Sequence, residues 1–265
     1  MVEVRFEGVT KRYDDGTEAV IDLDLTVNDG EFLVLVGPSG CGKSTSLRML
    51  AGLEDVTEGK ILIDGNVVND LPPGARDVGM VFQSYALYPH MTVSDNLSFG
   101  LRMQKGEARL SDSEIAIRVT EAAELLGLSE HLAKKPKELS GGQRQRCWIA
   151  MVLAQQTDLI LLDEPTTFLD LKVQVELLAL LSRLAHDHGR TLLLVLHDLN
   201  LAAAYADHLV MMRDGQIVIS GTPSDVFTAA NLKRVFDLDA HILRDPASGS
   251  PVCVPFTSAT LQAAL

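Results

Sequence analysis

The stretch Gly37-Pro38-Ser39-Gly40-Cys41-Gly42-Lys43-Ser44-Thr45 has the pattern G-x-x-x-x-G-K-S, which is typical of a loop that cradles a polyphosphate. The apolar run at 32–36 before it suits a buried parallel strand, and residues 46–51 after it are mostly good helix formers. In this strand–loop–helix context, backbone amides and the helix N-terminus would face the phosphates. Lys43 would reach the β- and γ-phosphates, and the Ser44 hydroxyl would hold Mg²⁺.

The composition is that of a folded, acidic protein. The chain has 265 residues, of which 46% are hydrophobic, and a formal net charge of −13. That charge disfavours a nucleic-acid partner and adhesion to anionic lipid. No apolar run is long enough for a transmembrane helix, and the first residues are unlike a signal peptide. The three cysteines have no metal-binding spacing. We therefore expect a reduced, cytosolic protein without direct membrane insertion.

Polar side chains follow three apolar runs of strand length. The runs cover residues 78–82, 159–162 and 192–196. Gln83 follows the first run, Asp163 and Glu164 the second, and His197 the third. Because ligands of open α/β sheets lie at the carboxyl ends of the strands, we expect these side chains to meet near one phosphate. Asp163 would hold the metal through water, and Glu164 would orient and deprotonate the attacking water.

Further strands and helices follow from alternation, periodicity and turn residues. Strands are predicted at 2–13, 17–28, 59–64, 208–213 and 216–220, and two short ones within 239–256; helices are predicted at 169–188 and 222–237. Asp14-Asp15-Gly16 is a hairpin signal between the first two strands. Tyr13 stands just before this turn, where it is either a core or edge aromatic or a platform on which adenine stacks.

The middle of the chain, from Thr92 to about Ala154, is predicted to be helical. Ser111-Asp112-Ser113-Glu114 is a capping box for one helix. Ser140 is well placed as the N-cap of another, which begins at Gly141-Gly142. The amides of these two glycines would form a second anion site, although Ser-Gly-Gly alone is equally compatible with a simple capping loop. The apolar group at 84–91 is either a docking surface or packing beneath a loop.

These motifs, in this order, make the chain similar to the ATP-binding-cassette ATPases over nearly its whole length. The pattern Leu-Ser-Gly-Gly-Gln at 139–143 is the hallmark of that family, and Leu-Leu-Asp-Glu-Pro at 161–165 accompanies it. The resemblance implies an α/β fold: a P-loop NTPase, RecA-like core with an N-terminal antiparallel β-subdomain and an inserted α-helical subdomain. We expect one domain over 1–265, with the core at 1–90 and 155–265 and the helical subdomain at 91–154.

The resemblance also assigns a role to each site residue, with ATP and Mg²⁺ as ligands. Lys43, Gln83, Glu164 and His197 would be catalytic, with Glu164 as the base and His197 as the switch histidine on the γ-phosphate. Ser44, Gln83 and Asp163 would serve the metal. The residues that bind nucleotide would be Tyr13, Ser39, Gly40, Cys41, Gly42, Lys43, Ser44, Thr45, Ser140, Gly141, Gly142, Gln143 and Asp170. Phe168 is bulkier than the residue that many relatives have in the loop before Asp170.

The family works as a head-to-tail dimer, in which ATP lies between the phosphate loop of one subunit and the Ser140–Gln143 segment of the other. This arrangement would explain why one chain has two anion sites far apart in sequence. The resemblance implies a second copy of the chain and integral membrane permease subunits as partners. It places the protein on the cytoplasmic face of the inner (plasma) membrane, peripheral through the permease.

The two halves resemble different branches of the family. Residues 1–146 are similar to sugar-importer ATPases, and residues 147–265 to ferric-siderophore importer ATPases, as expected of a natural mosaic or an engineered chimera joined near Gln143–Cys147. The further regulatory β-domain of the sugar branch is not expected, because the chain ends at Leu265. The cargo, sugar or siderophore, stays open. The alternatives are a non-transport cassette ATPase and a module that binds ATP without hydrolysing it.

Overall fold

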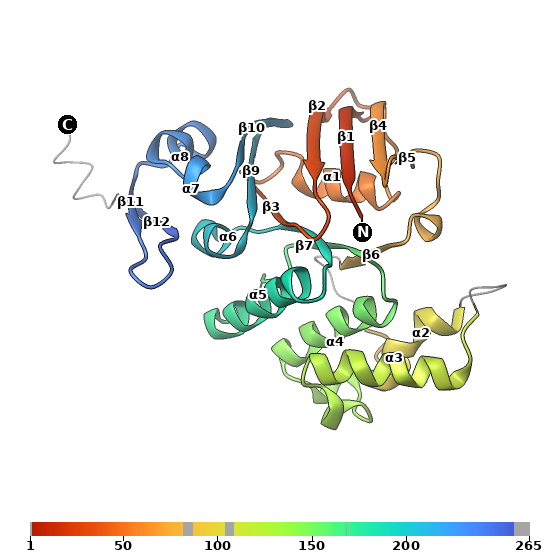
Figure 1. Ribbon diagram of the computed structural model, residues 1–265. Coiled ribbons are helices and arrows are strands. Elements are labelled where there is room, and N and C mark those ends of the chain that lie inside the picture. Colours follow the sequence, from red (N-terminus) through yellow and green to blue (C-terminus); the bar gives the residue numbers. More distant parts are fainter. Residues whose placement is uncertain (1, 82–86, 104–108, 168, 257–265) are drawn as a thin grey trace.

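The central feature of the protein is a six-stranded, mostly parallel sheet (Figure 1). The computed structural model describes residues 2–81, 87–103, 109–167 and 169–256. Among these, the sheet has the order β10-β9-β3-β8-β7-β6. Its strands are β3 (Phe32–Val36), β6 (Val78–Val81), β7 (Leu159–Asp163), β8 (Thr191–Val195), β9 (His208–Arg213) and β10 (Gln216–Gly221). Only β10 runs antiparallel to its neighbour. The expected α/β fold with a P-loop NTPase core is therefore confirmed.

Strand β3 lies inside this sheet, between β8 and β9, and all five of its residues are buried. Its side chains alternate between two hydrophobic clusters, as the pleat requires. Phe32, Val34 and Val36 belong to the cluster that contains most of the helices. Leu33 and Leu35 belong to the cluster shared with the N-terminal sheet. A continuous apolar run thus covers both faces of a buried parallel strand, and the phosphate loop leaves from its carboxyl end.

A second, antiparallel sheet packs beside the core and holds helix α1 (Lys43–Leu50) between the two sheets (Figure 1). It has the order β2-β1-β4-β5, with β1 (Val4–Arg12), β2 (Glu18–Val27), β4 (Glu58–Ile63) and β5 (Asn66–Val67). The Ile21 amide of β2 donates to the carbonyl of Gly215, which lies in the turn between β9 and β10. The N-terminal hairpin is therefore attached directly to the core sheet, close to the phosphate loop.

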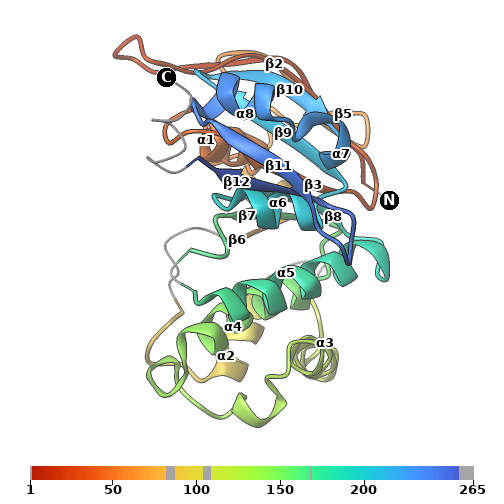
Figure 2. The ribbon, with the colours of Figure 1, turned by 90° about the vertical axis from the view of Figure 1, so that its left-hand side faces the viewer.

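Helices α2 (Val93–Met103), α3 (Asp112–Leu125) and α4 (Gly141–Ala154) pack together at one end of the molecule (Figure 2). Single-turn 3₁₀ helices lie at Pro73–Ala75, Ser129–His131 and Pro136–Glu138. The predicted capping box of Ser111 and Glu114 begins α3, and the predicted N-cap Ser140 begins α4, where it forms a capping box with Gln143. Helix α5 (Leu171–His186) lies between these helices and the sheets (Figure 2). No described helix has the length and apolar character needed to cross a bilayer.

The C-terminal part contains α6 (Leu199–Tyr205), α7 (Pro223–Val226), α8 (Ala229–Phe236) and a hairpin of β11 (Ala240–Arg244) and β12 (Pro251–Pro255). The single helix predicted at 222–237 is wrong, because Thr228 leaves the helical conformation and caps α8. The helical spacing of the apolar residues predicts that Val175 faces inward from the helix expected at 169–188, but this residue of α5 is 39% exposed, so the prediction is wrong. Asn200 of α6 pairs with both the amide and the carbonyl of Cys253, and so attaches the hairpin to the core.

Candidate functional site

The phosphate loop needs glycine at two positions for lack of space. A Cβ atom on Gly42 would lie 2.4 Å from the carbonyl oxygen of Ala19, and Gly42 has a φ of 99°. A Cβ atom on Gly37 would lie 2.3 Å from the carbonyl oxygen of Met212. Both contacts are too close for any side chain, and the positive φ of Gly42 disfavours one further. The loop is therefore held between the N-terminal hairpin and strand β9.

The Lys43 side chain turns back on the loop that precedes it. Its ammonium donates to the carbonyl oxygens of Gly37 and Pro38, each at 2.8 Å, and lies 3.5 Å from the Cys41 sulfur. The residue is only 5% exposed. Because these hydrogen bonds go to neutral groups, an incoming polyphosphate would offer the ammonium a stronger, charge-assisted interaction.

Ser44 and Asp163 meet although they are far apart in the sequence. The Ser44 hydroxyl donates to a carboxylate oxygen of Asp163 at 2.7 Å. Burial raises the pKa of Asp163, and the hydrogen bond from Ser44 opposes this only in part. A hydroxyl beside a buried carboxylate is the oxygen donor set that Mg²⁺ takes with a phosphate ligand. The side chains of Ser44 and Asp163 therefore match the oxygen ligands expected for the predicted Mg²⁺ ion. Gln83, the third predicted metal residue, lies outside the described residues.

Glu164 is held at both of its carboxylate oxygens. His197 Nε2 lies 2.6 Å from Oε1, and the Thr167 hydroxyl donates to Oε2 at 3.3 Å. Glu164 is 8% exposed and has a φ of 53°, an uncommon conformation for a residue with a side chain. Such a conformation persists only where the surroundings fix it. The amide of Glu164 donates to the Val195 carbonyl at the end of β8, which joins the turn to the core sheet.

These groups line one cavity of about 150 Å³. Its walls are formed by Ser39, Gly40, Cys41, Gly42, Lys43, Ser44, Thr45, Glu164 and His197. The loop after β3, the turn after β7 and the turn after β8 thus come together at the carboxyl edge of the sheet, as the polar strand ends predicted. Asp163 borders the same site through its bond to Ser44.

The other predicted nucleotide residues lie elsewhere on the chain. None of Ser140, Gly141, Gly142, Gln143, Tyr13 or Asp170 lines that cavity among the described residues. Ser140 and Gln143 form the capping box of α4, and Asp170 caps α5 by accepting from the Val173 amide. Tyr13 is 36% exposed, with the Lys11 ammonium 5.0 Å from its ring centroid. Their nucleotide roles remain predictions.

The apolar group proposed as a docking surface is only partly exposed. Tyr88 is 38% exposed and packs against Phe99, with ring centroids 4.7 Å apart. Leu87 is partly buried against the main hydrophobic cluster. Tyr85 lies outside the described residues. Leu87 therefore packs against the core, and a docking role for the exposed ring of Tyr88 stays a prediction.

Sequence reasoning missed two polar residues next to the site. Thr167 holds Glu164, as described above, and Gln145 donates from α4 to the Pro165 carbonyl. Neither residue follows an apolar strand, so the pattern that identified Asp163 and His197 did not apply to them. Only their distance along the chain from residues already identified could have pointed to them. Thr167 lies three residues after Glu164, and Gln145 lies one turn inside a capped helix.

A strand, phosphate loop and helix, with two carboxylates at the end of another strand of the same sheet, define a P-loop nucleotide-binding protein. The sequence profile described as "ABC transporter" matches residues 20–167, which is more than half of the chain. The chain therefore belongs to the ABC transporter family, and it corresponds to the ATP-binding cassette.

Two of the relatives found by sequence are named as import proteins. An oligosaccharides import ATP-binding protein of Bacillus subtilis is 48% identical over 227 residues, which is 86% of this chain and 61% of the relative. The chain thus spans about three fifths of that relative's length. An sn-glycerol-3-phosphate import ATP-binding protein of Rhodopseudomonas palustris is 45% identical over 262 residues, covering 95% of this chain and 71% of the relative.

Solved structures agree with the fold. A cassette solved as a dimer in a post-hydrolysis state, with ADP and Pi, has a TM-score of 0.74 and 34% identity; the match covers 83% of this chain and 98% of that one. A chain from a transporter assigned to the metal-chelate type, in an inward-facing conformation, has a TM-score of 0.83 and 27% identity, with coverage of 97% and 98%.

Proposed function

We propose that this chain binds and hydrolyses ATP as the ATP-binding subunit of an importer. The observation that carries the proposal is the single cavity in which the phosphate loop, Glu164 and His197 meet. A phosphate-binding loop alone would only hold nucleotide. A carboxylate and an imidazole 2.6 Å apart at its mouth add a base and a group that orients it.

Each residue has a defined task in this proposal. The Lys43 ammonium leaves the carbonyls of its own loop and binds the β- and γ-phosphates. Glu164 accepts a proton from the attacking water, while His197 and Thr167 hold its carboxylate in place. Ser44 and Asp163 hold Mg²⁺, with Gln83 as a further predicted metal residue. When bound, the ion neutralises charge on the phosphate oxygens.

The assembly we propose is a head-to-tail dimer with ATP at the interface. Support comes from the place of Ser140 and Gly141, which are exposed at the start of α4 and do not line the phosphate-loop cavity of their own chain. A second copy would bring this helix start to the nucleotide. In this proposal the core comprises 1–90 and 155–265, the helical subdomain 91–154, and the dimer drives a separate permease from the cytoplasmic face of the membrane.

For the cargo, we propose a sugar or a related small polar solute. The two relatives described above are named for import of oligosaccharides and of sn-glycerol-3-phosphate. The alternative, a ferric siderophore, draws support from the similarity to the metal-chelate type transporter. The cassette itself does not decide the cargo, since it lies on the far side of the permease from the solute.

The test of hydrolysis is Glu164→Gln, which keeps the shape of the side chain but removes the base. We expect ATP binding close to that of the parent and a turnover at least about a hundredfold lower. The matched control is Glu58→Gln, at an exposed carboxylate of the antiparallel sheet, which should leave turnover unchanged. Hydrolysis by Glu164→Gln at the parent rate would contradict the assignment of the base. An absence of ATP binding by the parent would contradict the whole proposal.

A further inference from the structure

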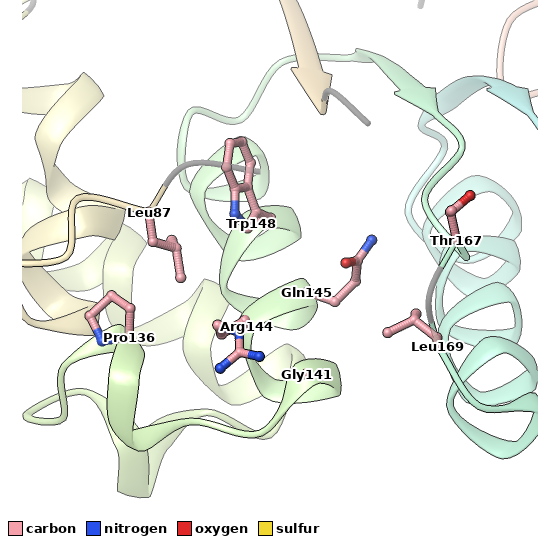
Figure 3. Close-up of a pocket in the computed structure, with 8 residues that line it drawn as sticks. All are labelled: Leu87, Pro136, Gly141, Arg144, Gln145, Trp148, Thr167 and Leu169. Carbon is pink, nitrogen blue, oxygen red and sulfur yellow. The ribbon is translucent and has the colours of Figure 1, made fainter. Parts of the chain in front are cut away.

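Gln145 is a buried polar side chain within helix α4. It is 3% exposed, and its amide group donates to the carbonyl oxygen of Pro165. Figure 3 shows the side chain extending from α4 toward the loop that carries Thr167 and Leu169. A buried amide aimed at a backbone carbonyl of another segment fixes the position of that segment. Here the segment is the turn directly after Glu164.

The two segments joined by this hydrogen bond are separated by a cavity of about 340 Å³. Trp148 and Arg144 line it from α4, and Thr167 and Leu169 line it from the other side (Figure 3). Because close packing is what makes an interface rigid, a cavity at this place leaves α4 room to shift against the loop. Gln145 lines the same cavity, and its hydrogen bond to Pro165 joins the two segments.

The Pro165 carbonyl is close in the chain to Glu164, the proposed catalytic base. Pro165 follows Glu164 in the chain, and Thr167 returns in the same turn, where its amide donates to the Glu164 carbonyl and its hydroxyl to the Glu164 carboxylate. A displacement of the Pro165 carbonyl therefore rotates the backbone of the turn that contains Glu164 and Thr167.

The signature segment, residues 139–143, lies at the start of helix α4. Ser140 and Gly141 lie at its start, and Gln145 lies little more than one turn further along. Arg146, the next residue, pairs with Glu176 of α5. A force on the start of α4 reaches Gln145 through the rigid helix, so one short element joins the signature segment to the turn after Glu164.

We infer that Gln145 is a positioning residue that couples the place of α4 to the orientation of Glu164. This inference rests on the proposed function and deepens it. When the signature segment engages nucleotide, Gln145 transmits the shift of α4 to the Pro165 carbonyl. Hydrolysis then depends on the docking of α4, although Gln145 itself touches no reacting atom.

The kinetic test is Gln145→Leu, which keeps the volume of the side chain but cannot donate a hydrogen bond. We expect kcat to fall about tenfold, while the Kd for ATP stays within about twofold of the parent, because misplacing a carboxylate slows chemistry without removing the phosphate site. The matched control is Gln155→Leu, at the other end of the same helix, where the amide donates only to Met151 within α4. A parent-like kcat for Gln145→Leu, or equal losses in both variants, would overturn the inference.

A second variant distinguishes hydrogen bonding from packing. In Gln145→Glu a protonated carboxyl group can donate to the Pro165 carbonyl, and a carboxylate cannot. We expect its kcat, divided by that of the parent at the same pH, to rise as the pH is lowered through the titration of this carboxyl. A ratio that is constant with pH would mean that Gln145 contributes volume alone.

A readout without hydrolysis separates this inference from the proposed function. Trp148 is the only tryptophan of the chain and lines the same cavity. In the Glu164→Gln background, ATP should change the emission of Trp148, and the additional substitution Gln145→Leu should remove most of that change at an unaltered Kd. An identical response in both proteins would overturn the coupling even if the parent hydrolyses ATP. A clear difference would support it even if the parent does not.

Discussion

The carboxyl group of Asp163 is almost completely buried, with 1% of the residue exposed. Burial raises its pKa above the value in the unfolded chain. The folded protein therefore binds this proton more tightly than the unfolded chain does, and the stability that Asp163 contributes is present at low pH. It is lost as the pH rises from the unfolded pKa through the raised one. Above its raised pKa, the ionised Asp163 is thus destabilising in the nucleotide-free chain.

The upward direction of the Asp163 pKa shift leads to a prediction for the variant Asp163→Asn. Without nucleotide and Mg²⁺, the variant should have a higher Tm than the parent at neutral pH, because it does not bury a charge. The difference should shrink as the pH is lowered and the parent carboxyl takes up its proton. Thermal unfolding of both proteins across the pH range measures it, with Asp14→Asn in the exposed β1–β2 turn as the control. A lower Tm for Asp163→Asn at neutral pH would contradict the prediction.

At the scale of the element, helix α4 is exposed to solvent at its start and buried in the hydrophobic core further along. Ser140 accepts from the Gln143 amide and closes the capping box at its start, while Cys147 and Ile149 are fully buried. Burial raises the pKa of Cys147 to about 12, so its thiol stays protonated. The helix thus has one end free to meet a partner and one end fixed in the hydrophobic cluster.

We predict that Ser140→Arg prevents the ATP-dependent dimer. In the Glu164→Gln background, ATP and Mg²⁺ should produce a dimer that returns to monomers when ATP is removed. Adding Ser140→Arg should leave monomers that bind ATP with nearly the parent affinity, since an arginine at the exposed helix start blocks the approach of the second copy. The mass of the particle by light scattering measures the outcome.

Loss of the cap is a separate effect with its own control. Removing a serine N-cap costs about 1 kcal/mol of helix stability. Ser111→Arg breaks the equivalent capping box of α3, which is not part of the proposed interface. It should lower the Tm to a similar degree and leave the dimer intact. If Ser111→Arg prevents dimer formation as well, the effect of Ser140→Arg would come from destabilisation rather than from the interface.

Much of the architecture could be predicted because the signals were local. The apolar run before Gly37, the capping residues Ser111 and Ser140, and the turn at Asp214-Gly215 each specify their own element. The meeting of Glu164 with His197 followed from one general property, that parallel strands end at the same edge. This rule needs no knowledge of how the strands are ordered.

Features that depend on tertiary packing could not be predicted in the same way. Val175 has the spacing of an inward residue, yet α5 is turned so that Leu180 is buried instead. The break at Thr228 comes from its side-chain bond to the Asn231 amide, which competes with a continuous helix. Gln145 is polar and lies in a helix, so sequence alone gives no reason to bury it. The sequence does not identify its hydrogen-bond acceptor either, because the acceptor is a backbone carbonyl and every residue has one.

For the whole molecule, the open question is which permease the cassette serves. Residues 84–138 include the exposed ring of Tyr88 and precede residue 147, where the predicted similarity to the siderophore branch begins. Hydrolysis is common to both branches, but coupling depends on the fit between the helical end of the cassette and one permease. We predict that docking preference follows residues 84–138 and favours a sugar permease.

Co-expression with a permease of each type tests this preference. The measured quantity is ATPase activity of the purified complex relative to the cassette alone. Stimulation by the sugar permease is expected, and stimulation only by the siderophore permease would refute the claim that the N-terminal half decides the partner. Tyr88→Ala, which removes the exposed ring, should reduce stimulation several-fold at unchanged basal turnover.

The strand order also determines when the phosphate loop can take shape during synthesis. Leu33 of β3 pairs with Leu193 on one side and His208 on the other, so both neighbours of this strand leave the ribosome long after it does. Until then the apolar residues of β3 have no sheet to join, and contacts between such distant segments form slowly. A growing chain would therefore gain the ability to hold nucleotide only after β9 is made, and would need protection of β3 from aggregation until then.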